Sequence, residues 1–353
     1  MIIDVTGFGW SGSGAVLDLL REYNDVYDPT PYKNGKPWEF TFLQCVDGIA
    51  DLEWHLMTIH RRIFDSDIAL SRFLALARKL CKHPLYRYES IFGGQFYRIC
   101  EEYVEELTGM SFMSRTFYDR MKNPGKEIVR SVWNKSIDAT VGKLQGKKRA
   151  SQLYYRDFRS IRVSYEPNLF LEATQRFVTR LLNVLRKGED RPLLMDHLLP
   201  PDVPNLFFKY FSEPIKCIVV RRDPRDLYVL AKEIYYGMIP IPTENVEDFI
   251  WFYRHTIERT KIDDTSNLLN LWFEDLIFNY EETKTIIEEF TDVHQHSIPK
   301  QLFKPELSRG NTCIFENYPS LRRDIDQIEK ELPESLYPFR ENRERNVSID
   351  NIF

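Results

Sequence analysis

Four short apolar stretches have the length and residue types of buried β-strands. They cover residues 2–6, 192–195, 215–220 and 268–272. A helical pattern of apolar positions follows the first stretch and both of the last two. Buried strands that alternate with helices are typical of a parallel sheet. The pattern therefore predicts an α/β protein built on a parallel sheet.

Between about residue 45 and residue 188 the apolar positions follow a helical period, with few strand signals. The clearest helix there ends just before Gly188, a suitable C-cap residue. One stripe of this helix consists of Phe170, Ala173, Phe177, Val178, Leu181, Leu182 and Leu185. We expect this stripe to belong to the core, and the region 45–188 to be a large helical insertion.

The chain is predicted to form one domain over residues 1–340. Its sheet core comes from about 1–30 and 190–320, and the helical insertion covers about 45–188. The polar segment 341–353 is expected to be a flexible tail. The basic run 143–149 is interpreted as a solvated surface.

Composition excludes several classes of protein. Among the 353 residues, 43% are hydrophobic and 29% are charged, so the chain is expected to fold throughout. A net charge of -5 disfavours a dedicated nucleic-acid binder. The five cysteines lack the close pairs of a zinc or redox motif, so we expect reduced thiols and no metal. No apolar run is long enough to span a membrane and the start lacks signal-peptide features, which predicts a cytoplasmic protein.

A glycine-rich segment, 7–14, lies between the first strand and its helix. A strand, tight loop and helix in this order direct several backbone amides at one point, where the helix N-terminus adds partial positive charge. Ser11 and Ser13 add hydroxyl donors. Gly7 and Gly12 have the spacing of a Walker loop, but Ser13 stands where its lysine should be, which disfavours an ATPase. The alternative is a turn whose glycines serve packing alone.

Three segments together resemble the PAPS-dependent sulfotransferase family, which has a P-loop-like α/β fold. Segment 219–227 is similar to the family's strand, turn and helix at the 3′-phosphate, and 271–276 with 280–283 to its late strand and helix. The loop around the 5′-phosphosulfate is matched by Gly9, Trp10, Ser11, Gly12, Ser13 and Gly14. The resemblance implies PAPS as co-substrate, and it implies that the helical insertion of about 45–188 lies on the acceptor side.

Arg222 is the residue that this resemblance assigns to the 3′-phosphate. The apolar strand ends at Arg222, Asp223 can cap the following helix, and Pro224 suits its first turn. A guanidinium is thereby expected at the carboxyl edge of the sheet, where ligands of α/β proteins bind. The alternative is a surface arginine paired with Asp223 or Asp226. Arg309 and Gly310 resemble the element that closes over the same phosphate.

His197 is the predicted catalytic base, because segment 195–200 resembles the family's His-Leu-Pro stretch. A histidine titrates near neutrality without special tuning, as a base for a hydroxyl proton should. Asp196 either orients the imidazole or acts in its place, and Glu39 and Glu53 are further candidates. The alternative is that His197 is a packed structural residue.

Two positions differ from the family's pattern. Trp10 stands where most members have lysine or arginine, and Leu230 where a serine often binds the 3′-phosphate. Lys33 and Lys36 are candidates to supply the missing charge.

The sequence therefore predicts transfer of a sulfuryl group from PAPS to a hydroxyl acceptor, with a saccharide as one candidate and without a metal or nucleic acid. A P-loop kinase-like phosphotransferase and a non-catalytic nucleotide-binding protein are the alternatives. We expect Tyr32, Trp38 and Trp54 to pack in the core, and stacking on a sugar is the alternative.

Overall fold

The computed structural model describes residues 1–29, 39–58, 62–84, 86–146, 158–165, 167–236, 238, 240–258 and 263–339. Lys33, Lys36, Tyr32 and Trp38 lie outside these ranges, as do the 341–353 tail and the end of the basic run.

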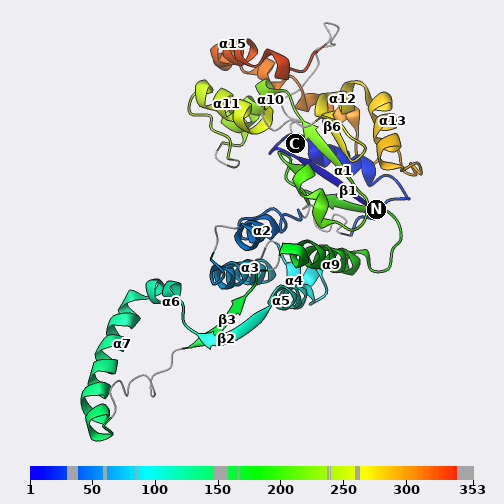
Figure 1. Ribbon diagram of the computed structural model, residues 1–353. Coiled ribbons are helices and arrows are strands. Elements are labelled where there is room, and N and C mark those ends of the chain that lie inside the picture. The colour runs from blue at the N-terminus through cyan, green and yellow to red at the C-terminus, as the bar shows by residue number, and fades with distance from the viewer. Residues whose placement is uncertain are drawn as a thin grey trace.

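A parallel sheet forms the centre of the molecule (Figure 1). Within the described residues it has four strands in the order β4-β1-β5-β6, which are Leu193–Asp196, Ile2–Gly7, Ile215–Arg221 and Leu268–Trp272. All neighbouring strands are parallel. The four predicted strands and the α/β class are therefore confirmed.

The two faces of the sheet are covered by different helices. Ile3 and Val5 of β1 point toward one face, and Ile2 and Asp4 toward the other, as the two-residue period of a strand requires. The first face packs against α1 (Ser13–Leu20), α12 (Phe273–Phe278) and α13 (Tyr280–Thr291).

The second face packs against helices of the predicted insertion. They are α2 (Ile49–Met57), α3 (Asp65–Lys82), α4 (Tyr88–Ile91), α5 (Phe96–Glu106) and α9 (Pro167–Arg186). Every residue of the predicted stripe on α9 is buried in this core, and Gly188 has φ 88° just after the helix. The prediction for this helix is confirmed.

A third apolar cluster lies beyond the edge of the sheet. It joins α10 (Pro224–Val229), α11 (Val246–Phe252) and α15 (Arg322–Glu331). The short helix α14 (Pro305–Ser308) precedes the segment that crosses toward α10. Together these elements enclose the chain that follows β5.

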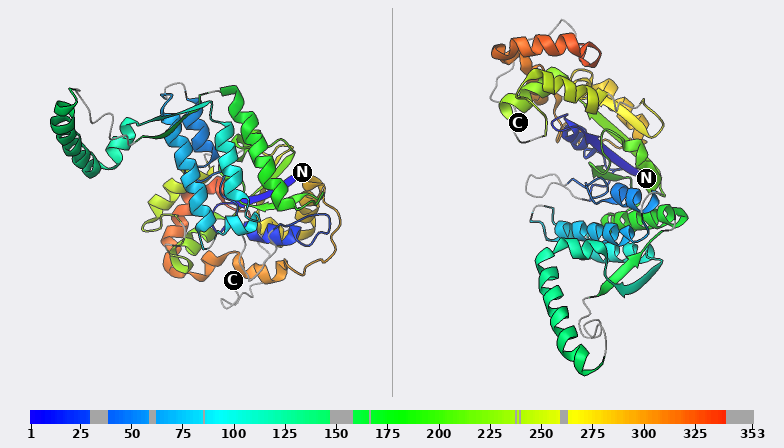
Figure 2. Two further views of the ribbon diagram at one scale, coloured as in Figure 1. Left: turned by 90° about the horizontal axis from the view of Figure 1, so that it is seen from below. Right: turned by 60° about the vertical axis from the view of Figure 1, so that its left-hand side comes forward.

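An arm projects from the helical region (Figures 1 and 2). It consists of an antiparallel ribbon, β2 (Met110–Ser114) and β3 (Arg159–Val163), followed at its far end by α6 (Phe117–Lys122) and α7 (Pro124–Ile137). The sequence pattern did not predict this ribbon. No helix in the described part of the chain is long and apolar enough to cross a membrane.

Candidate functional site

The glycine-rich loop lies at the carboxyl edge of the sheet, between two neighbouring strand ends. β1 ends at Gly7 and pairs with β4 on one side and β5 on the other. Because all three strands are parallel, the loop, the Asp196–His197 pair and Arg222 all lie at one edge. The structure thus brings together the three segments that the sequence singled out.

The glycines permit close packing around this loop. Gly12 has φ 91° at the N-cap of α1, and a Cβ there would lie 2.3 Å from the Phe273 ring. A Cβ on Gly7 would lie 2.1 Å from Ser11 Oγ. No side chain caps the N-terminus of α1. The amides of its first turn therefore lack a side-chain acceptor, as a site for an anion requires.

Trp10 adopts a left-handed conformation within the loop. Its φ is 64°, and its indole stacks on Tyr235 with ring centroids 3.7 Å apart and planes 5° from parallel. The side chain at the loop position where the resemblance implies a cation is therefore fixed against a second aromatic ring. Lys33 and Lys36, the predicted substitutes, lie outside the described residues.

Arg222 is buried and is bonded to backbone carbonyls. Its side chain donates to the carbonyl of Trp10 at 3.0 Å and to that of Asn311, and its guanidinium lies 4.9 Å from the Phe273 ring centroid. Arg222 is only 3% exposed, so it is not a surface arginine. Asp223 instead caps α10, accepting from the Arg225 amide at 2.9 Å.

Five buried polar atoms around Arg222 have no hydrogen-bond partner among the described residues. They are Trp10 Nε1, Ser11 Oγ, Arg222 Nε, Glu274 Oε2 and Asn311 Oδ1. Buried polar groups are nearly always paired, with protein or with a bound species. Their concentration beside the loop therefore favours a polar ligand there. Sequence reasoning missed Asn311, for which the adjacent Arg309 and Gly310 were the only signal.

Several buried carboxyl groups surround the Arg222 guanidinium. Burial and the charge of Asp223 raise the pKa of Glu274 to about 8, although Arg222 opposes this rise. Burial likewise raises the pKa of Asp226, whose oxygens accept from the amides of Cys313 and Phe315. Burial also lowers the pKa of Arg222, whereas the charges of Asp226, Glu274 and Asp223 oppose this. The guanidinium is therefore the cation of a buried cluster that also contains carboxyl groups.

Leu230 and Arg309, the other positions compared with the family's 3′-phosphate site, lie in different surroundings from Arg222. Leu230 is fully buried in the third apolar cluster, so it is a packing residue. The segment 309–311 reaches Arg222 through the Asn311 carbonyl. The Arg309 side chain, however, lines a surface cavity of about 370 Å³ together with Tyr280 and Lys300.

The turn that contains His197 is fixed by a buried carboxylate. Asp4, in the middle of β1, accepts from the amides of Leu198 at 2.9 Å and Leu199 at 3.0 Å. Gln44 donates to the His197 carbonyl at 2.7 Å. His197 itself has φ 53°, an uncommon left-handed conformation. The surrounding structure therefore determines the position of the imidazole.

Both ring nitrogens of His197 face acceptors. Nδ1 lies 2.6 Å from Asp196 Oδ1, and Nε2 lies 3.1 Å from the Gly7 carbonyl oxygen. Only a doubly protonated ring donates to both. Burial lowers the pKa of His197, but the hydrogen bond and the charge of Asp196 outweigh it and raise the pKa to about 9. The prediction that His197 titrates near neutrality is therefore wrong.

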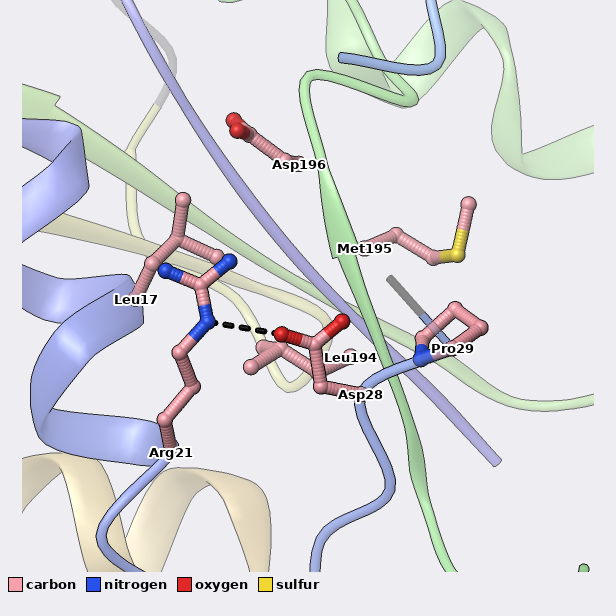
Figure 3. A pocket seen from close by; sticks show the side chains of 7 residues that line it. All are labelled: Leu17, Arg21, Asp28, Pro29, Leu194, Met195 and Asp196. Carbon is pink, nitrogen blue, oxygen red and sulfur yellow. Dashed lines mark hydrogen bonds and ion pairs between the residues drawn. The ribbon is translucent and has the colours of Figure 1, made fainter. Parts of the chain in front are cut away.

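Asp196 also borders a small pocket under α1 (Figure 3). The cation in this pocket, Arg21, is paired with Asp28 at 2.7 Å and with Asp18 at 2.9 Å. Of the other carboxylates considered as bases, Glu39 acts electrostatically on His197. Glu53 is bonded to Tyr210 and to Lys209.

Comparison with known proteins gives one structural likeness. No protein-family model matches the chain, and no curated protein matches it. Among solved structures, the chain is similar to the sulfotransferase domain of the Synechococcus PCC 7002 olefin synthase. The TM-score is 0.41 at 11% identity, over 96% of this chain and 95% of that one.

We predict that Gly12→Ala and Gly14→Ala have opposite effects on stability. Gly12→Ala should cost about 2 kcal/mol or more, because alanine disfavours a positive φ and its methyl group would collide with Phe273. Gly14 lies in α1 with nothing within 4 Å of the added Cβ, so Gly14→Ala should stabilise by about 0.5–1 kcal/mol. Urea unfolding measures both. Equal effects would contradict the packing of Gly12 on Phe273.

We also predict that His197 titrates near pH 9, and that Asp196→Asn lowers its pKa to 6.5 or below. Without the carboxylate, burial favours the neutral form of the ring, and only the weaker effects of the Glu39 and Asp4 charges oppose it. NMR titration of the imidazole carbon resonances measures both values, and His197→Gln identifies the His197 signal among the seven histidines. A wild-type pKa near 6.5 would show that the Asp196 contact does not persist in solution.

Proposed function

We propose that this protein transfers a sulfuryl group from PAPS to a hydroxyl group of an acceptor. The observation that supports this most strongly is the group of unpaired buried polar atoms on the loop and around Arg222. They lie at the carboxyl edge of a parallel sheet, beside an uncapped helix N-terminus. Such an edge binds phosphate-bearing ligands in α/β proteins.

In this proposal the loop and the first turn of α1 hold the 5′-phosphosulfate of PAPS. Backbone amides and the hydroxyls of Ser11 and Ser13 supply its donors. Arg222 fixes the Trp10 carbonyl and thereby the shape of the loop. Its unpaired Nε is left for the 3′-phosphate, and the unpaired Asn311 Oδ1 can accept from a donor of the nucleotide.

Transfer requires an acceptor oxygen to attack sulfur while the bond from sulfur to the 5′-phosphate oxygen breaks. PAP leaves, and the acceptor's proton passes to a base. We assign this proton to His197, with Asp196 as the group that orients the ring. His197 can accept it only when neutral and released from the Gly7 carbonyl. With a pKa of about 9, only roughly one ring in a hundred is neutral at pH 7.

The acceptor is proposed to be a hydroxyl compound, with a saccharide as one candidate. Trp54 on α2 is 60% exposed, so the expectation that it packs in the core is wrong. An exposed indole is a surface on which a sugar ring can stack. The stacked Trp10–Tyr235 pair favours a second candidate function, nucleotide binding without transfer, because it occupies the family's cation position. A turnover assay separates the two.

We predict that the protein binds PAP in calorimetric titration and does not bind ATP with Mg²⁺ comparably. Arg222→Ala should weaken PAP binding by roughly tenfold to a hundredfold, the range of a charge-assisted hydrogen bond. It should weaken the binding of adenosine 5′-phosphosulfate less, because this ligand lacks the 3′-phosphate and loses only the support of the loop. Equal losses of affinity for the two ligands would show that Arg222 supports the loop and does not contact the 3′-phosphate. Absence of PAP binding by the wild type would overturn the proposed function.

The rate of transfer should rise with pH through about 9 if His197 is the base, because only its neutral form accepts a proton. His197→Gln should remove this rise and lower kcat by roughly 10²–10⁴ while PAP affinity stays within about twofold. The assay uses radiolabelled PAPS and a screen of candidate acceptors. A rate that falls through pH 9 would show that the imidazolium charge is needed and that a carboxylate such as Asp196 is the base.

A further inference from the structure

Helix α7 exposes most of its apolar side chains to solvent, whereas the polar Glu127, Arg130 and Asn134 are only partly exposed. Ile128, Val129, Val132 and Trp133 are 68%, 70%, 60% and 57% exposed, respectively. They recur at the spacing of one helix face, and we call them the apolar stripe. No residue of α7 is buried. A helix of a globular protein normally shows the reverse orientation.

The polar face of α7 is held by contacts within the arm. Glu127 pairs with Arg115, whose side chain is buried, and lies 4.0 Å from Arg130. The pair with Arg115 ties this side of the helix to the rest of the arm, which projects from the body (Figure 2). The stripe lies on the exposed side of this helix.

The arm is basic although the whole chain is acidic. Between residues 115 and 146 there are seven lysines and arginines and three acidic residues, whereas the chain has a net charge of -5. None of the ion pairs among the described residues uses Lys122, Lys126 or Lys135. Lys126 and Lys135 are both exposed on α7, the helix that bears the stripe. Apolar and cationic groups are thus presented together.

We propose that α7 is an anchor that lies in the surface of an anionic membrane. A bilayer interface supplies both an apolar medium for the stripe and negative charge for the lysines, and tryptophan favours that depth. A second copy of the arm fits less well. It would bring like charges together, and four side chains fall short of the ~800 Å² per partner of a stable interface. This inference does not depend on the proposed sulfuryl transfer.

The test is flotation of the full-length protein with vesicles of phosphatidylcholine alone or mixed with phosphatidylglycerol. The wild type should float with the mixed vesicles, more weakly with neutral ones, and less at high salt. Trp133→Asp should reduce flotation by about tenfold or more, because it places a charge in the stripe. The matched control is Trp251→Asp on α11, where the indole is 63% exposed on the body of the protein. This control should float like the wild type.

Two results would overturn the proposal. One is a wild type that does not float with mixed vesicles, or a loss of flotation in Trp133→Asp that is no larger than the loss in Trp251→Asp. The other is a lipid-free dimer that Trp133→Asp dissociates in sedimentation, which would make the stripe a subunit interface. Circular dichroism checks that each variant folds, and Val129→Asp replaces Trp133→Asp should the latter fail to fold.

Discussion

The hydrogen bond from Arg222 to the Trp10 carbonyl joins the end of β5 to the glycine-rich loop, and the geometry of the site depends on it. A buried guanidinium is costly unless its donors are satisfied. Here two backbone carbonyls accept from it and the Phe273 ring lies against it. The same ring leaves no room for a side chain at position 12, because a Cβ on Gly12 would lie 2.3 Å from it. Loop shape, strand end and the segment at Asn311 are therefore fixed by one cation.

Burial also determines the electrostatics at this edge of the sheet. It raises the pKa of Glu274 and Asp226 beside Arg222, so these carboxyls lose charge, whereas Asp196 keeps the buried His197 protonated. The charge of Asp196 balances that of His197, whereas the carboxyls beside Arg222 compensate its charge less as they gain protons. In a partly desolvated site the charge of Arg222 acts strongly on an anion.

The local sequence pattern predicted the elements whose formation depends on neighbouring residues. The four strands, the loop and the buried stripe of α9 depend on residues close in sequence, and all three are present. The partners of Arg222 lie 212 and 89 residues away, and the Gly7 carbonyl lies 190 residues from His197. No periodicity reveals such contacts. The resemblance located Arg222 and His197, but the pKa of His197 and the unpaired Asn311 required the folded chain.

Helices α9 and α7 show where the physical limit of such prediction lies. Both carry an apolar stripe at helical spacing, yet α9 buries its stripe against the sheet while α7 exposes its own. The difference lies in tertiary contacts, because the pair of Arg115 with Glu127 ties the other side of α7 to the rest of the arm. Periodicity specifies that a helix has two faces, and only the contacts decide which face meets solvent. An exposed apolar face is costly in water, so α7 is stabilised most where another apolar medium covers it.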